Sequence, residues 1–336
     1  MLLAPIGVQG ILHPEAEVAT ATAARETNIP MILSTAATRS MEEVAKVHGD
    51  GHRWYQLYWY ATLFPLATIL DSLFVRPYSD EITVSLLNRA KKNGFSALII
   101  TLDTMSIGWR PHDLDTAYLP FFHSYGCQNG FADPVFMARY GKKPELRSKL
   151  AFPYNPHEIN ARVEQGDPEA KTMVHMGTEW VKEMSSGRQR SWDELKLLRD
   201  NWGGPLVLKG VQCAADAELA IDAGVDGIVV SNHGGRQVDG GVSALWSLEN
   251  IMRSTKVKEA QTSGKFTVLF DSSIRSGPDI FKALALGAQA VLRKSQSLIW
   301  LYAWCVSKCR RLFSYQWDDH TCMASLSEEL MVLSTS

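Results

Sequence analysis

The stretch GIVVSNHGGRQ at residues 227–237 joins a short apolar run to a cluster of polar residues and glycines. The run Gly227–Ser231 is aliphatic and shows no alternation of polar with apolar side chains. Such a run is typical of a strand that is buried on both faces, as in a parallel sheet covered by helices. The polar residues that follow it would then lie at the carboxyl end of the strand.

The same pattern recurs along the chain and predicts an α/β fold. Seven more short apolar runs are Leu2–Ile6, Met31–Ser34, Trp54–Tyr58, Ala97–Leu102, Pro205–Gly210, Thr267–Asp271 and Gln289–Leu292. Helix-like stretches lie between them, at Glu15–Thr27, Ser40–His48, Glu81–Asn93, Ala214–Ala223 and Asp279–Leu286. Ser40 and Glu43 have the spacing of a capping box. Eight strands in alternation with helices predict a (β/α)8 TIM barrel, with a doubly wound sheet as the alternative.

Two stretches interrupt this alternation. Residues 103–190 are too many for an ordinary βα loop and predict a functional excursion at the active site. Residues 60–76 form an apolar insert, but it contains Pro65 and Asp71 and is short for a membrane span, so we expect no membrane association.

Composition limits the classes of protein that are compatible with the chain. It has 336 residues, 46% of them hydrophobic, and a formal net charge of -2. These values fit a globular protein with a sizeable core and argue against a nucleic-acid partner, which would need a basic surface. An odd number of cysteines, five, and the absence of a basic, apolar leader predict a cytoplasmic protein without a disulfide framework. The spacing of Cys305, Cys309, His320 and Cys322 fits no zinc pattern well, so we expect no metal.

The active site of a (β/α)8 barrel lies at the carboxyl ends of its strands. There, His233 in a glycine-rich turn is suited to general-base catalysis, and Asp103 could accept its other ring N–H. Lys209 would stabilise a developing anion, while Arg236 and Arg110 could bind a carboxylate. A further group of residues follows the run Thr267–Asp271 and opens a helix, and it predicts a phosphate pocket. These residues are Ser272, Ser273, Arg275 and Gly277.

Each of these residues also has an ordinary structural interpretation. A single histidine or lysine at a strand end is more often a hydrogen-bonded structural residue, and Arg275 could form only a surface ion pair. A phosphate-binding barrel of another reaction type would have no need of His233, Arg236 and Arg110 together. The combination at one rim is therefore what favours an active site.

Several motifs, in one order, resemble the FMN-dependent 2-hydroxy-acid oxidases and dehydrogenases. The resemblance covers residues 1–292 and rests on Ala4–Gly7, Ser34–Ala36, Tyr55–Tyr58, Thr101–Thr104, Leu208–Gly210, Ser231–Gln237 and Asp271–Ala290. Residues 108–121, which contain Gly108-Trp109-Arg110-Pro111, look most like the lactate 2-monooxygenase members. The resemblance implies FMN as cofactor, a lactate-like L-2-hydroxy acid as substrate, O2 or another electron acceptor, and a homo-oligomer.

The resemblance also implies a role for each site residue. His233 would take a proton from the substrate and Asp103 would hold His233, while Tyr58, Arg110 and Arg236 would bind the substrate. Lys209 would stabilise the reduced flavin. The residues implied in FMN binding are Pro5, Ile6, Ser34, Gln56, Thr101, Lys209, Ser231, Asp271, Ser273 and Arg275.

The chain departs from the family pattern at five places. Residues 60–76 are an insert relative to the family, and residues 296–336 match nothing in it, so the resemblance implies a barrel of residues 1–295 followed by an atypical tail of residues 296–336. Family members carry a cap with an active-site tyrosine before the first strand, whereas this sequence starts at that strand, so we expect an N-terminally truncated barrel. Ser272-Ser273 replaces the usual Gly-Gly or Ser-Gly, and Arg293-Lys294-Ser295 follows the last run where Gly-Arg is usual. Two interpretations stay open. One is an enzyme that makes the 2-keto acid, with or without oxidative decarboxylation; the other is an inactive remnant or interaction protein with impaired FMN binding.

Overall fold

The computed structural model describes residues 1–59, 61–62, 80–116, 119–185, 187–188 and 190–293. These residues belong to one unit, Met1–Lys294. The expected insert at 60–76, apart from Ala61–Thr62, and the expected tail at 296–336 lie outside the described residues. The boundary at residue 295 therefore stays a prediction.

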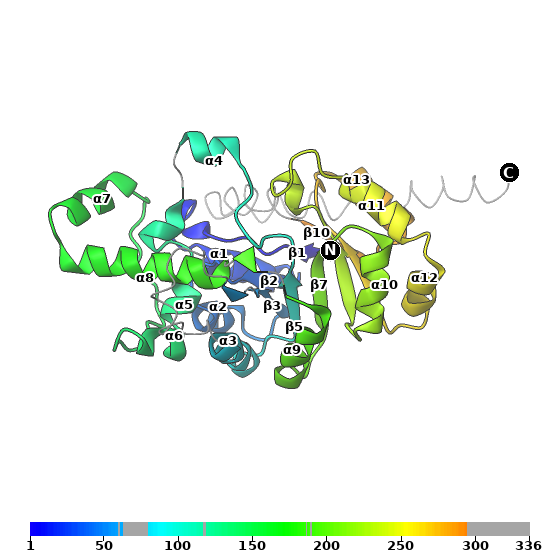
Figure 1. Cartoon of the computed structure of the whole chain (residues 1–336), viewed down its shortest axis with the longest axis horizontal. Helices are drawn as coiled ribbons and strands as arrows, with labels where there is room; N and C mark the ends of the chain where they lie inside the picture. The colour runs from blue at the N-terminus through cyan, green and yellow to red at the C-terminus, as the bar shows by residue number, and fades with distance from the viewer. Residues whose placement is uncertain (60, 63–79, 117–118, 186, 189, 294–336) are drawn as a thin grey trace, which may run out of the picture. The chain divides into compact units, whose positions relative to one another are not determined.

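Eight parallel strands close into a barrel, in the order β1-β10-β9-β8-β7-β5-β3-β2 (Figure 1). Strand β1 pairs with both β2 and β10, which closes the ring and rules out the doubly wound sheet. The predicted (β/α)8 barrel is thus confirmed. The strands are β1 (Leu2–Leu3), β2 (Met31–Ser34), β3 (Arg53–Tyr58), β5 (Ala97–Thr101), β7 (Leu206–Val211), β8 (Gly227–Val230), β9 (Thr267–Phe270) and β10 (Ala290–Arg293).

The apolar character of the strands follows from burial on both faces. One set of side chains, among them Ile32, Ile99 and Val229, forms a cluster that is separate from the main core. The alternate residues, such as Leu33 and Leu98, belong to the larger core shared with the helices. Successive strand side chains point to opposite faces, so a strand in this position has no solvent face on which polar residues could alternate.

Each of the five predicted stretches coincides, to within two residues at either end, with one of the helices that connect the strands. These helices are α1 (Glu17–Glu26), α2 (Met41–His48), α3 (Asp80–Lys92), α9 (Leu195–Asn201), α10 (Ala214–Asp222), α11 (Ala244–Ile251), α12 (Thr255–Thr262) and α13 (Gly277–Ala285). Ser40 and Glu43 form the expected capping box at the start of α2. Helices α9, α11 and α12 were not among the predicted stretches.

The long excursion between β5 and β7 folds into helices of its own. These are α4 (Pro111–Asp115), α5 (Gln128–Phe131), α6 (Pro134–Ala138), α7 (Pro156–Glu164) and α8 (Pro168–Met184). The two-residue strands β4 (Ala61–Thr62) and β6 (Gly187–Arg188) pair with each other in an antiparallel manner. None of the described helices is both long and apolar enough to cross a membrane.

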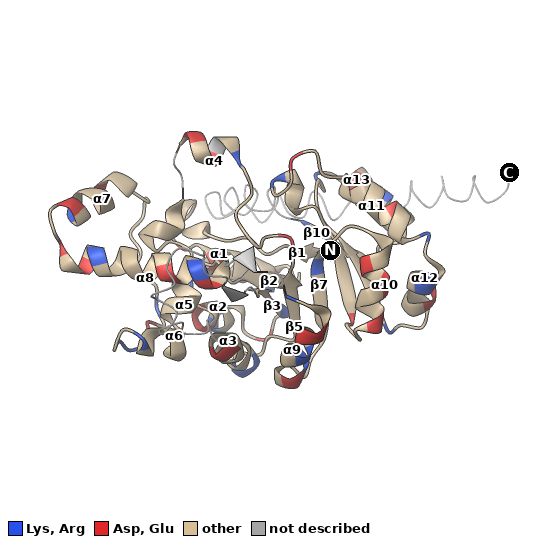
Figure 2. Ribbon diagram, in the orientation of Figure 1, with Lys and Arg blue, Asp and Glu red and all other residues tan. Residues whose placement is uncertain are grey.

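Charged residues are concentrated on the helices and loops, and few lie in the barrel strands (Figure 2). Within those strands they are Arg53, Lys209 and Arg293. Of the three, Lys209 is the one that is buried, with only 4% of its surface exposed. A buried lysine is rare in proteins unless carboxylates accompany it, so the residues around Lys209 are the first candidates for a functional site.

Candidate active site

Polar residues lie at or next to the carboxyl ends of β2, β3, β5, β7, β8 and β9, and the parallel arrangement brings these residues to one rim. Ser34 on β2, Gln56 on β3 and Thr101 on β5 are all buried. The Ser34 hydroxyl donates to Gln56 Oε1 at 3.0 Å, and Gln56 Nε2 donates to Thr101 Oγ1 at 2.9 Å. Lys209 on β7 continues this row, since it is the register partner of Thr101.

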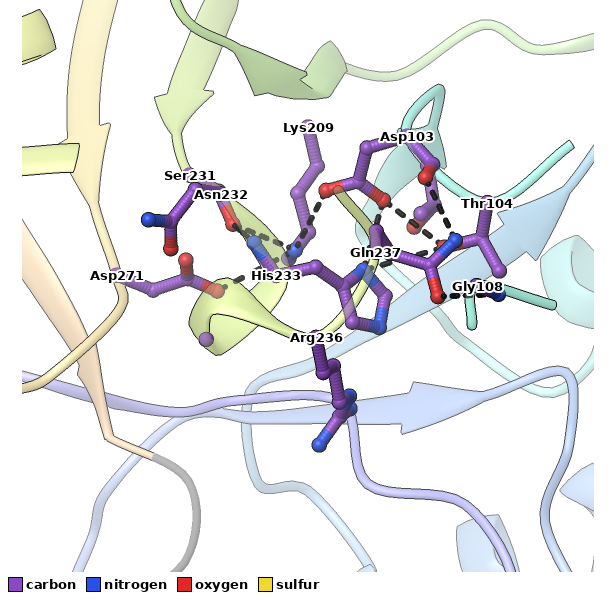
Figure 3. A network of polar contacts seen from close by, with 12 residues as sticks. Asp103, Thr104, Gly108, Lys209, Ser231, Asn232, His233, Arg236, Gln237 and Asp271 are labelled. Atoms are coloured by element: carbon purple, nitrogen blue, oxygen red, sulfur yellow. Dashed lines mark hydrogen bonds and ion pairs between the residues drawn. The ribbon is translucent and has the colours of Figure 1, made fainter. Parts of the chain in front are cut away.

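Lys209 connects the row to the next two strands (Figure 3). Its Nζ donates to Ser231 Oγ at 2.9 Å and lies 3.4 Å from Asp271 Oδ2 and 3.8 Å from Asp103 Oδ2. Burial alone would lower the pKa of Lys209, but the two carboxylates raise it above its ordinary value. The ammonium therefore stays charged and supplies a fixed positive charge inside the rim.

Asp103 follows β5 and touches both Lys209 and His233. Its Oδ1 lies 2.7 Å from His233 Nδ1. Burial raises the pKa of Asp103, but the charge of Lys209 and the contacts with His233 outweigh burial and lower it to about 2. The carboxylate is therefore ionised at neutral pH. The close approach of β7 to Asp103 depends on Gly210, which sits in a bulge of β7 at φ +104°, because a Cβ there would lie 2.8 Å from Asp103 Cβ.

His233 sits in a strained turn directly after β8. Its φ is +57°, and Gly234 and Gly235 follow at +75° and +73°. Its backbone N–H donates to Ser231 Oγ at 3.1 Å, which fixes the start of the turn. Left-handed backbone at a non-glycine residue costs free energy and is often found at functional sites. Because Asp103 binds Nδ1, the neutral ring carries its proton there, which leaves Nε2 as the basic nitrogen.

Thr104 is a member of the site to which no role had been assigned from the sequence. Its hydroxyl donates to Asp103 Oδ1 at 3.0 Å and lies 3.2 Å from His233 Nδ1. It is buried and also lines the cavity described next. The sequence feature that could have indicated this role is its position directly after Asp103.

A cavity of about 290 Å³ opens beside His233. Arg110, Arg236 and Tyr58 line it, together with Thr104, Ser185 and one acidic residue, Asp113, whose carboxylate lies 3.8 Å from Arg110 Nη1. Burial and the nearby Arg236 lower the pKa of Arg110, while burial and the charge of Asp103 raise the pKa of the Tyr58 phenol. Two guanidinium groups and a protonated phenol suit a bound carboxylate. The remaining wall includes Pro5, Ile6, Ser34 and the apolar Val8, Ile11, Ile107, Leu119, Pro120, Phe121, Val181 and Met184.

The loop after β9 lies on the other side of Lys209. The Ser272 hydroxyl donates to Asp271 Oδ1 at 3.0 Å and accepts the N–H groups of Asn232 at 3.3 Å and Gly234 at 3.2 Å. This hydroxyl therefore ties the loop to the His233 turn. Arg293, at the end of β10, donates from Nη2 to the backbone carbonyl of Arg275 at 3.1 Å. The two arginines thus meet next to the start of α13.

The same loop holds two serines in left-handed backbone conformation, Ser272 at φ +81° and Ser273 at φ +64°. The Ser273 side chain is exposed and makes no hydrogen bond within the described residues. We therefore expect Ser273→Gly to raise the free energy of unfolding by about 1 kcal/mol, because glycine adopts this conformation without the steric cost. Urea unfolding of both proteins measures the difference.

Ser272→Gly is the control for this prediction. It removes the same kind of strain but also the three hydrogen bonds of the Ser272 hydroxyl, so its stability should not rise. A Ser273→Gly protein that is less stable than the parent would contradict the strain argument.

Comparison with known proteins identifies relatives of this chain. The model of the family described as FMN-dependent dehydrogenase matches residues 1–303. The FMN-dependent alpha-hydroxy acid dehydrogenase qulF of Penicillium citrinum is 40% identical over 292 residues, which are 87% of this chain and 61% of that protein. An L-lactate oxidase of Lysinibacillus sphaericus is 33% identical over 87% of this chain and 62% of its own length.

Solved structures of similar fold include that of mandelate oxidase. The crystal structure of mandelate oxidase superimposes with a TM-score of 0.61 at 29% sequence identity, over 91% of this chain and 67% of that one. This chain spans about 61% of the length of the curated relatives just described. The match of the family model across the barrel, and the identity with these relatives, make the chain a member of the FMN-dependent dehydrogenase family.

Proposed function

We propose that the protein oxidises a lactate-like L-2-hydroxy acid to the 2-keto acid. The observation that carries this proposal is the buried series Lys209–Asp103–His233 next to a cavity with two arginines. A 2-hydroxy acid offers both a carboxylate for the arginines and a proton for the histidine. FMN, the cofactor of the family, would supply the acceptor for the two electrons that leave the substrate.

The residues at the rim fit FMN in their chemistry. Ser34, Gln56 and Thr101 offer a buried row of hydroxyl and amide groups beside the positive charge of Lys209. Positive charge near a flavin ring favours its anionic reduced form. The residues that we propose hold the cofactor are Pro5, Ile6, Ser34, Gln56, Thr101, Lys209, Ser231, Asp271, Ser273 and Arg275, with Arg293 added beside Arg275.

The chain's own residues divide the chemistry among them. Arg110 and Arg236 bind the substrate carboxylate, and the protonated Tyr58 donates a hydrogen bond to the same ligand. His233 acts as the general base, and its Nε2 takes the proton that the substrate loses. Asp103 holds the Nδ1 proton in place and stabilises the imidazolium ion that forms.

Arg236→Lys tests the binding of the substrate carboxylate. Lysine keeps the charge but cannot offer two parallel N–H donors. We therefore expect kcat/KM to fall by an amount equivalent to about 1.5–3 kcal/mol of lost transition-state stabilisation, much of it as a higher KM. Steady-state kinetics with L-lactate measures it. Arg253→Lys is the matched control, because Arg253 forms an exposed ion pair with Glu249 and should leave kinetics unchanged. An unchanged KM in Arg236→Lys would contradict this role.

Product analysis tests the proposed reaction. The purified protein should carry the visible absorbance of a flavin and convert L-lactate to pyruvate with O2 or a dye as electron acceptor. Acetate and CO2 in place of pyruvate would instead support the oxidative decarboxylation of a lactate 2-monooxygenase. A colourless protein that takes up no FMN would support the alternative of an inactive remnant.

A further inference from the structure

We propose that Gln237 is a positioning residue, which fastens the loop of residues 103–110 and sets the orientation of the Arg110 guanidinium. The part of this proposal that concerns substrate rests on the proposed function above. Gln237 comes from the turn after β8, whereas the loop follows β5, so the contact joins segments about 130 residues apart in sequence.

All the hydrogen-bonding capacity of the Gln237 amide is directed at this one loop. Its Nε2 donates to the backbone carbonyls of Asp103 at 2.9 Å and Ser106 at 3.0 Å. Its Oε1 accepts the backbone N–H of Gly108 at 3.3 Å and a hydrogen bond from Arg110 Nη2. Figure 3 shows the amide between Gly108 and the Asp103–Thr104 segment. One side chain thus contacts four residues of the loop.

The backbones of the two segments also meet directly. A Cβ at Gly108 would lie 2.7 Å from the carbonyl oxygens of Arg236 and Gln237, so only glycine allows this approach. Apolar packing does little to hold the loop, because Ile107 is 39% and Trp109 81% exposed. Asp103 and Thr104 contact His233 directly, at the start of the loop. Beyond them, the part of the loop from Ser106 to Arg110 is held to the His233 turn by the hydrogen bonds of Gln237 and by the one from Arg110 to the Arg236 carbonyl.

The attachment determines how Arg110 is presented to the cavity. Arg110 Nε donates to the carbonyl of Arg236 at 3.2 Å, and Nη2 donates to Gln237. One edge of the guanidinium is therefore held by the turn that carries His233 and Arg236. Nη1, which lies 3.8 Å from Asp113, is the nitrogen that we expect to meet a substrate carboxylate. Without Gln237, Arg110 would lose its fixed orientation relative to His233.

Gln237→Met tests the proposal, because methionine has a similar shape but cannot form these hydrogen bonds. We expect amide exchange with deuterium in residues 104–110 to become about tenfold faster, since Gly108 loses its acceptor. With L-lactate, KM should rise about tenfold while kcat changes less than about threefold. This division distinguishes positioning of Arg110 from a general loss of structure.

Gln237→Glu is the second variant, in case methionine prevents folding. Its carboxylate can still accept from Gly108 and Arg110 but cannot donate to Asp103 and Ser106. We expect intermediate exchange in residues 104–110, and a KM at least as high as in Gln237→Met, because the new carboxylate competes with substrate for Arg110.

Gln261→Met is the matched control. Gln261 is also half-buried, and its Nε2 donates to Gly287 O at 2.8 Å and Gln289 Oε1 at 3.2 Å, so the same substitution removes similar bonds elsewhere. It should change neither loop exchange nor KM. Unchanged exchange of residues 104–110 in Gln237→Met, or a loss confined to kcat, would overturn the proposal. If the parent protein turns over no 2-hydroxy acid, the proposed function fails, and the exchange experiment still decides whether the attachment exists.

Discussion

Replacement of His233 by glutamine is expected to lower turnover by about 10²–10⁴-fold, the usual contribution of a general base. Glutamine has a similar reach but cannot take up a proton. The Asp103 carboxylate, 2.7 Å from Nδ1, would then have no imidazolium to stabilise. FMN binding should persist, because the proposed cofactor contacts at Asp271 and Arg275 are unchanged. Rapid mixing with L-lactate without oxygen, followed by the flavin's visible absorbance, measures the rate.

His157→Gln is the control for this experiment. His157 lies on the exposed face of α7, so the same substitution there should leave the rate unchanged. A His233→Gln protein that reacts as fast as the parent would contradict the assignment of His233 as the base.

Lys209→Met is expected to lower the free energy of unfolding by about 3–5 kcal/mol at neutral pH, the range for removing one partner of a buried ion pair. The ammonium lies 3.4 Å from Asp271 Oδ2 and 3.8 Å from Asp103 Oδ2, and all three side chains are at most 8% exposed. Methionine fills a similar volume but leaves both carboxylates buried without their cation. Urea unfolding measures the loss.

The effect of Lys209→Met should depend on pH in a defined direction. In the parent protein the pKa of Asp103 is lowered to about 2, so this group contributes stability above the ordinary carboxyl pKa of about 4 and loses it as pH falls through 2. Without Lys209 the largest cause that lowers this pKa is gone, so the pKa of Asp103 is higher in the variant and the variant takes up this proton at a higher pH than the parent. The difference in stability between parent and variant should therefore shrink as pH falls through the acidic range towards 2.

A surface lysine provides the matched control for Lys209→Met. Lys196 forms an exposed ion pair with Asp200 at 2.8 Å, so Lys196→Met should cost less than about 1 kcal/mol. Equal stability of Lys209→Met and the parent at neutral pH would contradict the argument for a buried cation.

The barrel was largely predictable from the sequence because its strands are buried on both faces. The run Met31–Ser34 coincides with β2, since nothing within it interrupts the ladder. The run Leu2–Ile6 gives only Leu2–Leu3, because Pro5 has no N–H to continue the pairing. Pro205 likewise precedes the start of β7 at Leu206. Helices α9, α11 and α12 were not predicted.

The candidate site was predictable where chemistry and strand ends coincide, as for Lys209, Asp103 and His233. Residues that act through distant contacts were not. Thr104 and Gln237 gain their contacts only when the loops after β5 and β8 meet in space. The sequence showed serines at 272 and 273 in place of the family's usual pattern, but their positive φ angles required the structure.

The most direct test of the proposed function is mixing of the FMN-loaded parent protein with L-lactate in the absence of oxygen. The proposal predicts that the visible absorbance of the flavin disappears while one pyruvate forms per FMN. A protein that binds FMN but keeps this absorbance with L-lactate, and with larger L-2-hydroxy acids such as mandelate, would contradict it.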